Sequence, residues 1–93
     1  MDVSGITTIA NITDSTISTN GALVVSGGLG IAKSCFVGTT LNVAGASILS
    51  NTLNVTGIAT VSNTTDSTIS TDGALVVSGG LGIAKKCFIL EQL

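Results

Sequence analysis

The side chains in this sequence that could do chemistry are hydroxyls, a few carboxylates and two thiols. Serine and threonine are abundant, but the 93 residues include no histidine that could activate a hydroxyl as a nucleophile. Asp14 and Asp66 stand in two copies of Asp-Ser-Thr, and paired carboxylates can perform acid–base catalysis. Because aspartate commonly accepts hydrogen bonds from turn amides and hydroxyls, we interpret both as turn residues. We expect no catalytic residue and no enzymatic activity.

A glycine-rich run from Gly27 to Lys33 weakly resembles a phosphate-binding loop. It lacks the spacing and the following Ser or Thr of a P-loop, and the sequence predicts no helix after it. The run recurs from Gly79 to Lys85, which favours a structural role, because glycine allows a close approach of backbones or a sharp corner. We therefore expect no bound cofactor.

Cys35 and Cys87 occupy the same place in two sequence repeats, each directly before a phenylalanine. Two cysteines without histidine or further cysteine do not make a zinc site, so we expect no bound metal. We interpret both as buried small apolar residues, since free cysteine is among the most buried residue types. An interchain disulfide is the alternative, and the redox compartment stays undecided.

Composition predicts an ordered chain that cannot close a core by itself. Val, Ile and Thr recur throughout, charged residues make up 9%, and there are 12 Gly, no Trp, no Tyr and two Phe. A chain this poor in bulky side chains is expected to share its core with copies of itself as a homo-oligomer. The net charge of -2 leaves no basic patch for nucleic acid. The longest apolar stretch, Gly21 to Ala32, is shorter than the roughly 20 residues that span a membrane, so we expect no membrane partner.

The main feature of the sequence is internal repetition. Residues 11–37 and 63–89 match at a shift of 52 with four differences in 27 positions: Ile12/Thr64, Asn20/Asp72, Ser34/Lys86 and Val37/Ile89. Between them lie two 12-residue units, 40–51 and 52–63. Repeats of this kind are typical of units whose apolar face is covered by a neighbour.

Alternation within the short units predicts strands. Leu41 and Val43 alternate with Thr40 and Asn42, the period of two typical of half-buried strands. Asn20-Gly21 and Asp72-Gly73 predict turns. We therefore predict an all-β fold in which residues 1–93 form a single repetitive segment of an elongated, β-helix-like or β-solenoid-like fibre. A single-chain β-solenoid is the alternative.

Residues 18–45 read STNGALVVSGGLGIAKSCFVGTTLNVAG and residues 70–90 read STDGALVVSGGLGIAKKCFIL, which is close to the pattern ST-GALVVSGGxGIAKxLxVGxxLNVxG. This pattern resembles repeats in tail-fibre and virion-fibre proteins of bacteriophages and large DNA viruses. The sequence departs from it at Cys35-Phe36 and Cys87-Phe88, where the family usually has a Leu-Tyr pair, and at residues 90–93, which end the second copy before the expected glycine.

The resemblance implies an intertwined homotrimer that serves as a structural stalk of a viral fibre or spike, with rigid display and host attachment as its function. It also implies a location at the virion surface, with other virion structural proteins and a host surface receptor as partners. The alternative function is that of a β-solenoid adhesin or ice-binding module, in which rows of Thr and Ser form the recognition face. Asn11-Ile12-Thr13, Asn54-Val55-Thr56 and Asn63-Thr64-Thr65 fit the N-glycosylation pattern, but a chain rich in Asn and Thr produces this pattern by chance.

Overall fold

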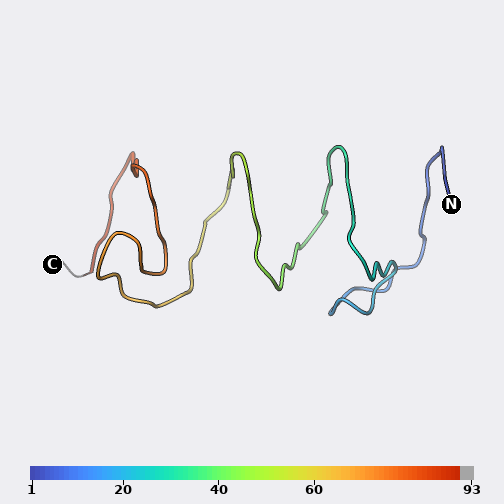
Figure 1. Ribbon diagram of the computed structural model, residues 1–93, viewed down its shortest axis with the longest axis horizontal. Helices are drawn as coiled ribbons and strands as arrows, with labels where there is room; N and C mark the ends of the chain where they lie inside the picture. Colours follow the sequence, from blue (N-terminus) through green and yellow to red (C-terminus); the bar gives the residue numbers. More distant parts are fainter. Residues whose placement is uncertain (91–93) are drawn as a thin grey trace. The chain divides into compact units, whose positions relative to one another are not determined.

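The computed structural model describes residues 1–90, and within this range it contains no α-helix and no β-strand. Figure 1 shows this part of the chain as a plain trace. The backbone of these residues is extended and coil-like. The prediction of an all-β fold is therefore wrong, both as a β-helix-like or β-solenoid-like fibre and as a single-chain β-solenoid.

The missing strands have a physical cause in the hydrogen bonding of the backbone. Residues such as Leu41 and Val43 favour an extended conformation, but a strand also needs a partner that completes a ladder of N–H···O=C bonds. In residues 1–90 the backbone–backbone hydrogen bonds are Asn20 N–H to Ile17 C=O (3.4 Å) and Asp72 N–H to Ile69 C=O (3.3 Å). Each of them closes a four-residue turn. The alternating sequence thus specifies extended backbone without supplying a strand to pair with it.

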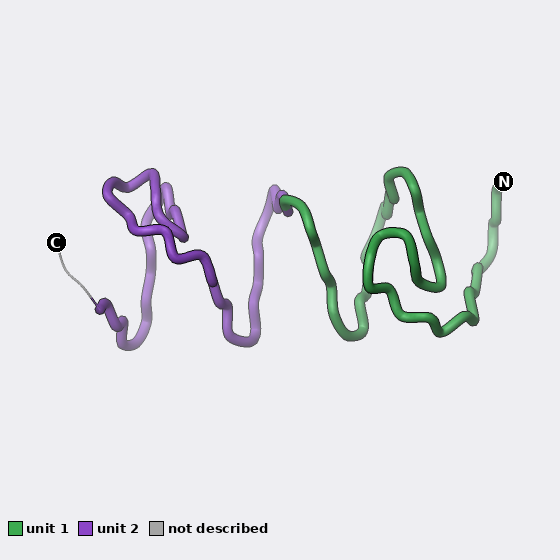
Figure 2. Tube along the Cα trace, turned by 90° about the horizontal axis from the view of Figure 1, so that it is seen from below, with its two compact units in different colours: residues 1–46 green, residues 47–93 purple. Residues whose placement is uncertain are grey.

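The chain divides into two units, Met1–Ala46 and Ser47–Leu93, which are coloured separately in Figure 2. Each unit contains one copy of the long repeat, residues 11–37 in the first and 63–89 in the second. Within each unit the trace reverses direction and curls into a loop (Figure 2). The prediction of a single repetitive segment over residues 1–93 stays a prediction.

The repeated sequence adopts a repeated conformation. Phe36 is 93% exposed and its equivalent Phe88 is 88% exposed, while Val24 and Val76 are 45% and 44% exposed. Because fractional exposure depends on the local backbone and neighbours, this agreement shows that the two copies have closely similar local structures.

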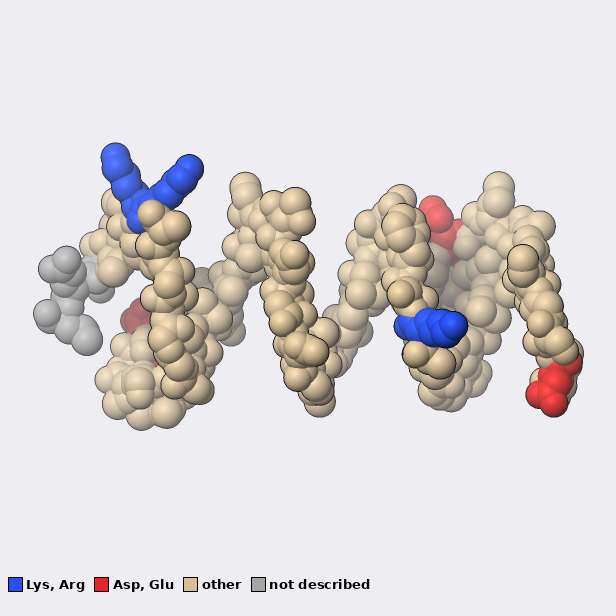
Figure 3. Space-filling view, turned by 90° about the horizontal axis from the view of Figure 1, so that it is seen from above, with Lys and Arg blue, Asp and Glu red and all other residues tan. Residues whose placement is uncertain are grey.

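No side chain in the described part of the chain is buried. Val24 and Val76 are exposed in the single chain, as are Cys35 and Cys87. The half-buried residues of the described range are Asn20, Gly21 and residues 72–74. On the face drawn in Figure 3, charged side chains are sparse on an otherwise uncharged surface. Residues 1–90 form no helix of the length and apolar character needed to cross a membrane.

Candidate functional site

Most side-chain hydrogen bonds of the described residues lie in two seven-residue loops. Loop 1 is residues 15–21, with the sequence Ser-Thr-Ile-Ser-Thr-Asn-Gly, and loop 2 is residues 67–73, in which Asp replaces Asn. The loops also contain most of the half-buried residues, and they are therefore the candidate sites of the described range.

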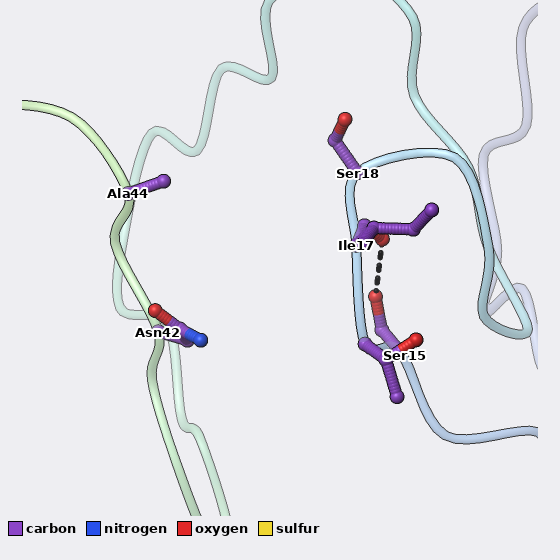
Figure 4. A pocket seen from close by; sticks show the side chains of 6 residues that line it. Ser15, Ile17, Ser18, Asn42 and Ala44 are labelled. Atoms are coloured by element: carbon purple, nitrogen blue, oxygen red, sulfur yellow. Dashed lines mark hydrogen bonds between the residues drawn. The ribbon is translucent and has the colours of Figure 1, made fainter.

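The first serine of each loop holds the loop closed. The hydroxyl of Ser15 donates to the carbonyl oxygens of Ile17 and Asn20, both at 3.0 Å. Figure 4 shows the bond to Ile17. In loop 2, Ser67 donates to Ile69 at 2.9 Å and to Asp72 at 3.2 Å. A hydroxyl has a single hydrogen, so it is shared between two carbonyls and ties both ends of the turn to the serine.

Asn20 organises loop 1 from the opposite end. Its Oδ1 accepts hydrogen bonds from the backbone N–H groups of Thr16 (2.8 Å) and Ile17 (3.2 Å). Its Nδ2 donates to Oγ1 of Thr16 at 2.8 Å. Both polar atoms of this side chain are thus hydrogen-bonded within the loop. These bonds take the place of backbone–backbone hydrogen bonds.

Asp72 takes the same place in loop 2. Its Oδ1 accepts from the backbone N–H groups of Thr68 (2.7 Å) and Ile69 (3.1 Å), and its Oδ2 accepts from the Thr68 hydroxyl at 2.5 Å. The Thr68 hydroxyl, followed by the backbone N–H groups of Ile69 and Thr68, lowers the pKa of Asp72 from 3.8 to about 2. These donors favour the ionised form because they all bind to the carboxylate.

The glycine that ends each loop is required by its backbone conformation and by its neighbours. Gly21 has φ of +116° and Gly73 has φ of +107°, and no other described residue has a positive φ. A Cβ added at Gly21 would lie 3.1 Å from Cβ of Ser15, and one at Gly73 would lie 3.0 Å from Cβ of Ser67. The hydrogen-bonded turns span residues 17–20 and 69–72, so each predicted Asx-Gly pair lies at the end of a turn, with the glycine after it in the left-handed conformation.

A partly open hollow of about 500 Å³ lies beside loop 1. Figure 4 shows its lining, with the loop on one side and the segment of Asn42 and Ala44 on the other. The full lining is Ser15, Thr16, Ile17, Ser18, Asn42 and Ala44. None of these side chains is an acid, a base or a thiol, so the hollow can offer hydrogen bonds and two apolar side chains, Ile17 and Ala44, but no acid–base chemistry.

Asp14 and Asp66 do not have the role that the sequence predicts for them. Among residues 1–90, the nearby turn amides are bound by asparagines instead: Thr13 N–H donates to Oδ1 of Asn11 at 2.8 Å, and Thr65 N–H donates to Oδ1 of Asn63 at 2.9 Å. Both asparagines also lie in the glycosylation-like patterns. Their turn role could have been found from their position two residues before the bonded amide.

The glycine-rich runs stand in open space in the single chain. A Cβ at any glycine of either run would meet no atom within 4 Å, and none of these glycines has a positive φ: Gly27, Gly28, Gly30, Gly79, Gly80 and Gly82. No segment of the described chain approaches these backbones closely. The predicted close approach of backbones at the runs stays a prediction for an assembly.

The remaining sequence candidates are the two cysteines. Cys35 and Cys87 are free and exposed, so the prediction that they are buried is wrong for the single chain. Within the described residues, no group of three or more His, Cys, Asp or Glu is placed to hold a metal ion.

Reasoning from the sequence alone missed the roles of Ser15 and Thr16. The signal was present in the sequence, because a Ser-Thr pair followed by Asx-Gly at a fixed distance is typical of loops closed by side chains.

The scan against models of protein families found no match, and neither did the comparisons with curated proteins and with solved structures.

Proposed function

We propose that this chain is a structural, self-associating segment of a viral fibre or spike stalk, displayed at the virion surface and without enzymatic activity. One observation carries the proposal: no described side chain is buried, although 44% of the residues are hydrophobic. The sequence resemblance to tail-fibre and virion-fibre repeats supports the viral context.

The size of the exposed surface supports association. The accessible surface of the chain is 9724 Å², whereas a compact monomer of 9.1 kDa exposes about 4,900 Å² by the usual scaling of surface with mass. The single chain thus exposes roughly twice the surface of a self-contained domain. Burying apolar surface stabilises a protein by about 25 cal/mol per Å². Large exposed apolar surface therefore favours an assembled state.

Copies of the same chain are the simplest partners for this surface. The exposures of equivalent residues in the two repeats agree, as at Val24 and Val76, so copies in register would present the same apolar pattern to each other along their length. Charged residues make up 9% of the sequence, which leaves little electrostatic means of selecting a different protein. The open space at Gly27, Gly28 and Gly30 leaves room for a neighbouring backbone.

The resemblance implies a trimer, and we propose three copies. Other virion structural proteins at the ends of the stalk and a host surface receptor at a tip complete the proposed set of partners.

The alternative function, an adhesin or ice-binding module, required a β-solenoid that displays rows of Thr and Ser. Residues 1–90 form no strands, so they do not provide such a surface.

The chemistry of the loops fits a structural role. The hydroxyls of Ser15 and Ser67 donate to carbonyl oxygens within their own loops, and the sequence has no histidine to activate them. The carboxylate of Asp72 is bound by three donors. These groups stabilise the loops.

Substitution of the repeated valines tests the proposal. In a Val24→Asp, Val76→Asp double variant, association would bury two unpaired charges per copy, so the assembly should dissociate. Ser34→Lys is the matched control, because it introduces a charge that the second repeat already carries at Lys86. Light scattering should show a reduced mass for the valine variant and an unchanged mass for the control. An unchanged mass in the valine variant would contradict the proposal.

A further inference from the structure

Asn20 is the only asparagine in the sequence that is directly followed by a glycine. The other asparagines precede Ile, Val or Thr: Asn11, Asn42, Asn51, Asn54 and Asn63. In an Asn-Gly pair the glycine nitrogen can attack the side-chain carbonyl carbon of the asparagine. Glycine lacks the Cβ that would hinder this approach, whereas β-branched residues hinder it strongly. Asparagine side-chain amides are among the thermolabile groups of proteins.

The hydrogen bonds of loop 1 surround the reacting amide. Oδ1 of Asn20 accepts from the N–H groups of Thr16 and Ile17 at 2.8 and 3.2 Å. Negative charge develops on this oxygen when a nucleophile adds to the carbon, and backbone N–H donors stabilise such charge. This arrangement makes the side-chain carbon more electrophilic.

The hydrogen bonds of the leaving nitrogen and of the attacking nitrogen also favour the reaction. Nδ2 of Asn20 donates to Oγ1 of Thr16 at 2.8 Å, so a hydroxyl lies beside the nitrogen that must gain a proton before it departs. Among the described residues, no acceptor binds the N–H of Gly21. Its nitrogen is therefore not held in another hydrogen bond.

Loop 2 shows that the product fits. Asp72 stands where Asn20 stands, and its Oδ1 keeps both backbone bonds, to Thr68 at 2.7 Å and to Ile69 at 3.1 Å. An aspartate at position 20 could therefore hold loop 1 as Asp72 holds loop 2.

We propose that Asn20 is a site of spontaneous deamidation, promoted by the hydrogen bonds of loop 1, and that the aspartate formed there holds the loop as Asp72 does. The nitrogen of Gly21 bonds to the side-chain carbon of Asn20 and gives its proton to solvent water. The bond from that carbon to Nδ2 then breaks as Nδ2 takes up a proton and leaves as ammonia. Water then opens the five-membered imide. Its addition at the side-chain carbonyl gives aspartate, and its addition at the backbone carbonyl gives isoaspartate.

The modification changes the chemistry of the first repeat. Each copy gains one negative charge, and loop 1 becomes chemically equivalent to loop 2 at the position where the two differ. This inference depends on the geometry of loop 1 and not on the proposed stalk function.

Peptide mapping by mass spectrometry tests the site. The full chain is kept at neutral pH and sampled over time for replacement of an amide by a carboxylate. A Val43→Gly variant supplies the control, because it creates a second Asn-Gly pair at Asn42, whose side chain makes no hydrogen bond within the described residues. We expect Asn20 to convert several-fold faster than Asn42 in this variant. Equal rates, or a faster rate at Asn42, would overturn the role of the loop.

Two further measurements keep the test independent of the folding of that variant. In the wild-type chain, urea should slow conversion at Asn20 several-fold because it removes the loop; a rate that is unchanged or higher in urea contradicts the proposal. The aspartate product should give the same amide NMR signals at Thr16 and Ile17 as an Asn20→Asp standard. Product signals typical of an open chain would contradict retention of the loop.

Discussion

The hydroxyl of Thr68 donates to Oδ2 of Asp72 at 2.5 Å, and this bond runs in the opposite direction from its counterpart in the first repeat. There, Nδ2 of Asn20 donates to the hydroxyl oxygen of Thr16 at 2.8 Å. The change from Asn to Asp thus preserves the shape of the loop and reverses one donor–acceptor pair. It also places a group that titrates in loop 2 where loop 1 has none.

Loop 2 should lose stability in acid while loop 1 does not. The pKa of Asp72 is about 2 in the loop against 3.8 ordinarily. Because the pKa is lowered on loop formation, the carboxylate stabilises loop 2 fully above its ordinary pKa, and this stabilisation is lost as the pH falls from about 4 to about 2. NMR should show the amide signals of Thr68 and Ile69 moving over this range.

The equivalent amides of Thr16 and Ile17 are the internal control for the acid titration, because they donate to the neutral amide of Asn20. Their signals should stay constant over the same pH range. A midpoint for loop 2 at the ordinary aspartate value, or parallel movement of both loops, would show that the carboxylate bonds do not form as described.

Exchanging the two residues should exchange the pH response. Asp72→Asn should make loop 2 insensitive to acid, since the neutral amide can accept from the same backbone N–H groups as Asn20 does. Asn20→Asp should give loop 1 an acid transition like that of loop 2. The measurement is the same NMR titration, and a response that stays with loop 2 in both variants would locate its cause elsewhere.

Alanine at the loop glycines should open the loops. Gly21→Ala or Gly73→Ala forces a side chain into a left-handed conformation and places its Cβ about 3 Å from the loop serine, at a cost of roughly 1–3 kcal/mol. Gly27→Ala is the control, since its Cβ would meet no atom within 4 Å. Backbone coupling constants should change in loop 1 for Gly21→Ala and stay unchanged there for Gly27→Ala. Equal effects of the two variants would argue against this backbone geometry.

The serine that begins each loop should matter more than the serine within it. Ser15→Ala removes the donor to the carbonyls of Ile17 and Asn20, which should destabilise loop 1 by about 1 kcal/mol. Ser18→Ala is the control, because the Ser18 side chain makes no hydrogen bond within residues 1–90. Hydrogen exchange at the Asn20 amide should accelerate in the first variant and not in the second. Faster hydrogen exchange in both variants would contradict the role of the Ser15 hydroxyl in closing loop 1.

The turns could be predicted from the sequence because their cause is local. Asn20-Gly21 and Asp72-Gly73 place a glycine where a positive φ is needed, next to a side chain that binds backbone amides a few residues away. The near identity of the long repeats is matched by the equivalent hydrogen bonds of the two loops.

The strands could not be predicted correctly because pairing is not local. Alternation of Leu41 and Val43 with polar residues is typical of a strand, but it does not say which segment completes the ladder, and no described segment does so. Asp14 was mistaken for the turn residue because Asn11, three positions earlier, binds the nearby amide. In both errors the hydrogen-bond partner was predicted wrongly. The type of a residue alone does not determine which partner its polar groups bind.

Sedimentation equilibrium of the unmodified chain, over a range of concentrations, tests the central claim of self-association most directly. We expect a mass of three times the 9.1 kDa chain at high concentration, with dissociation on dilution. A chain that sediments at 9.1 kDa at every concentration would contradict the account, because its exposed aliphatic side chains would then remain in water without a partner.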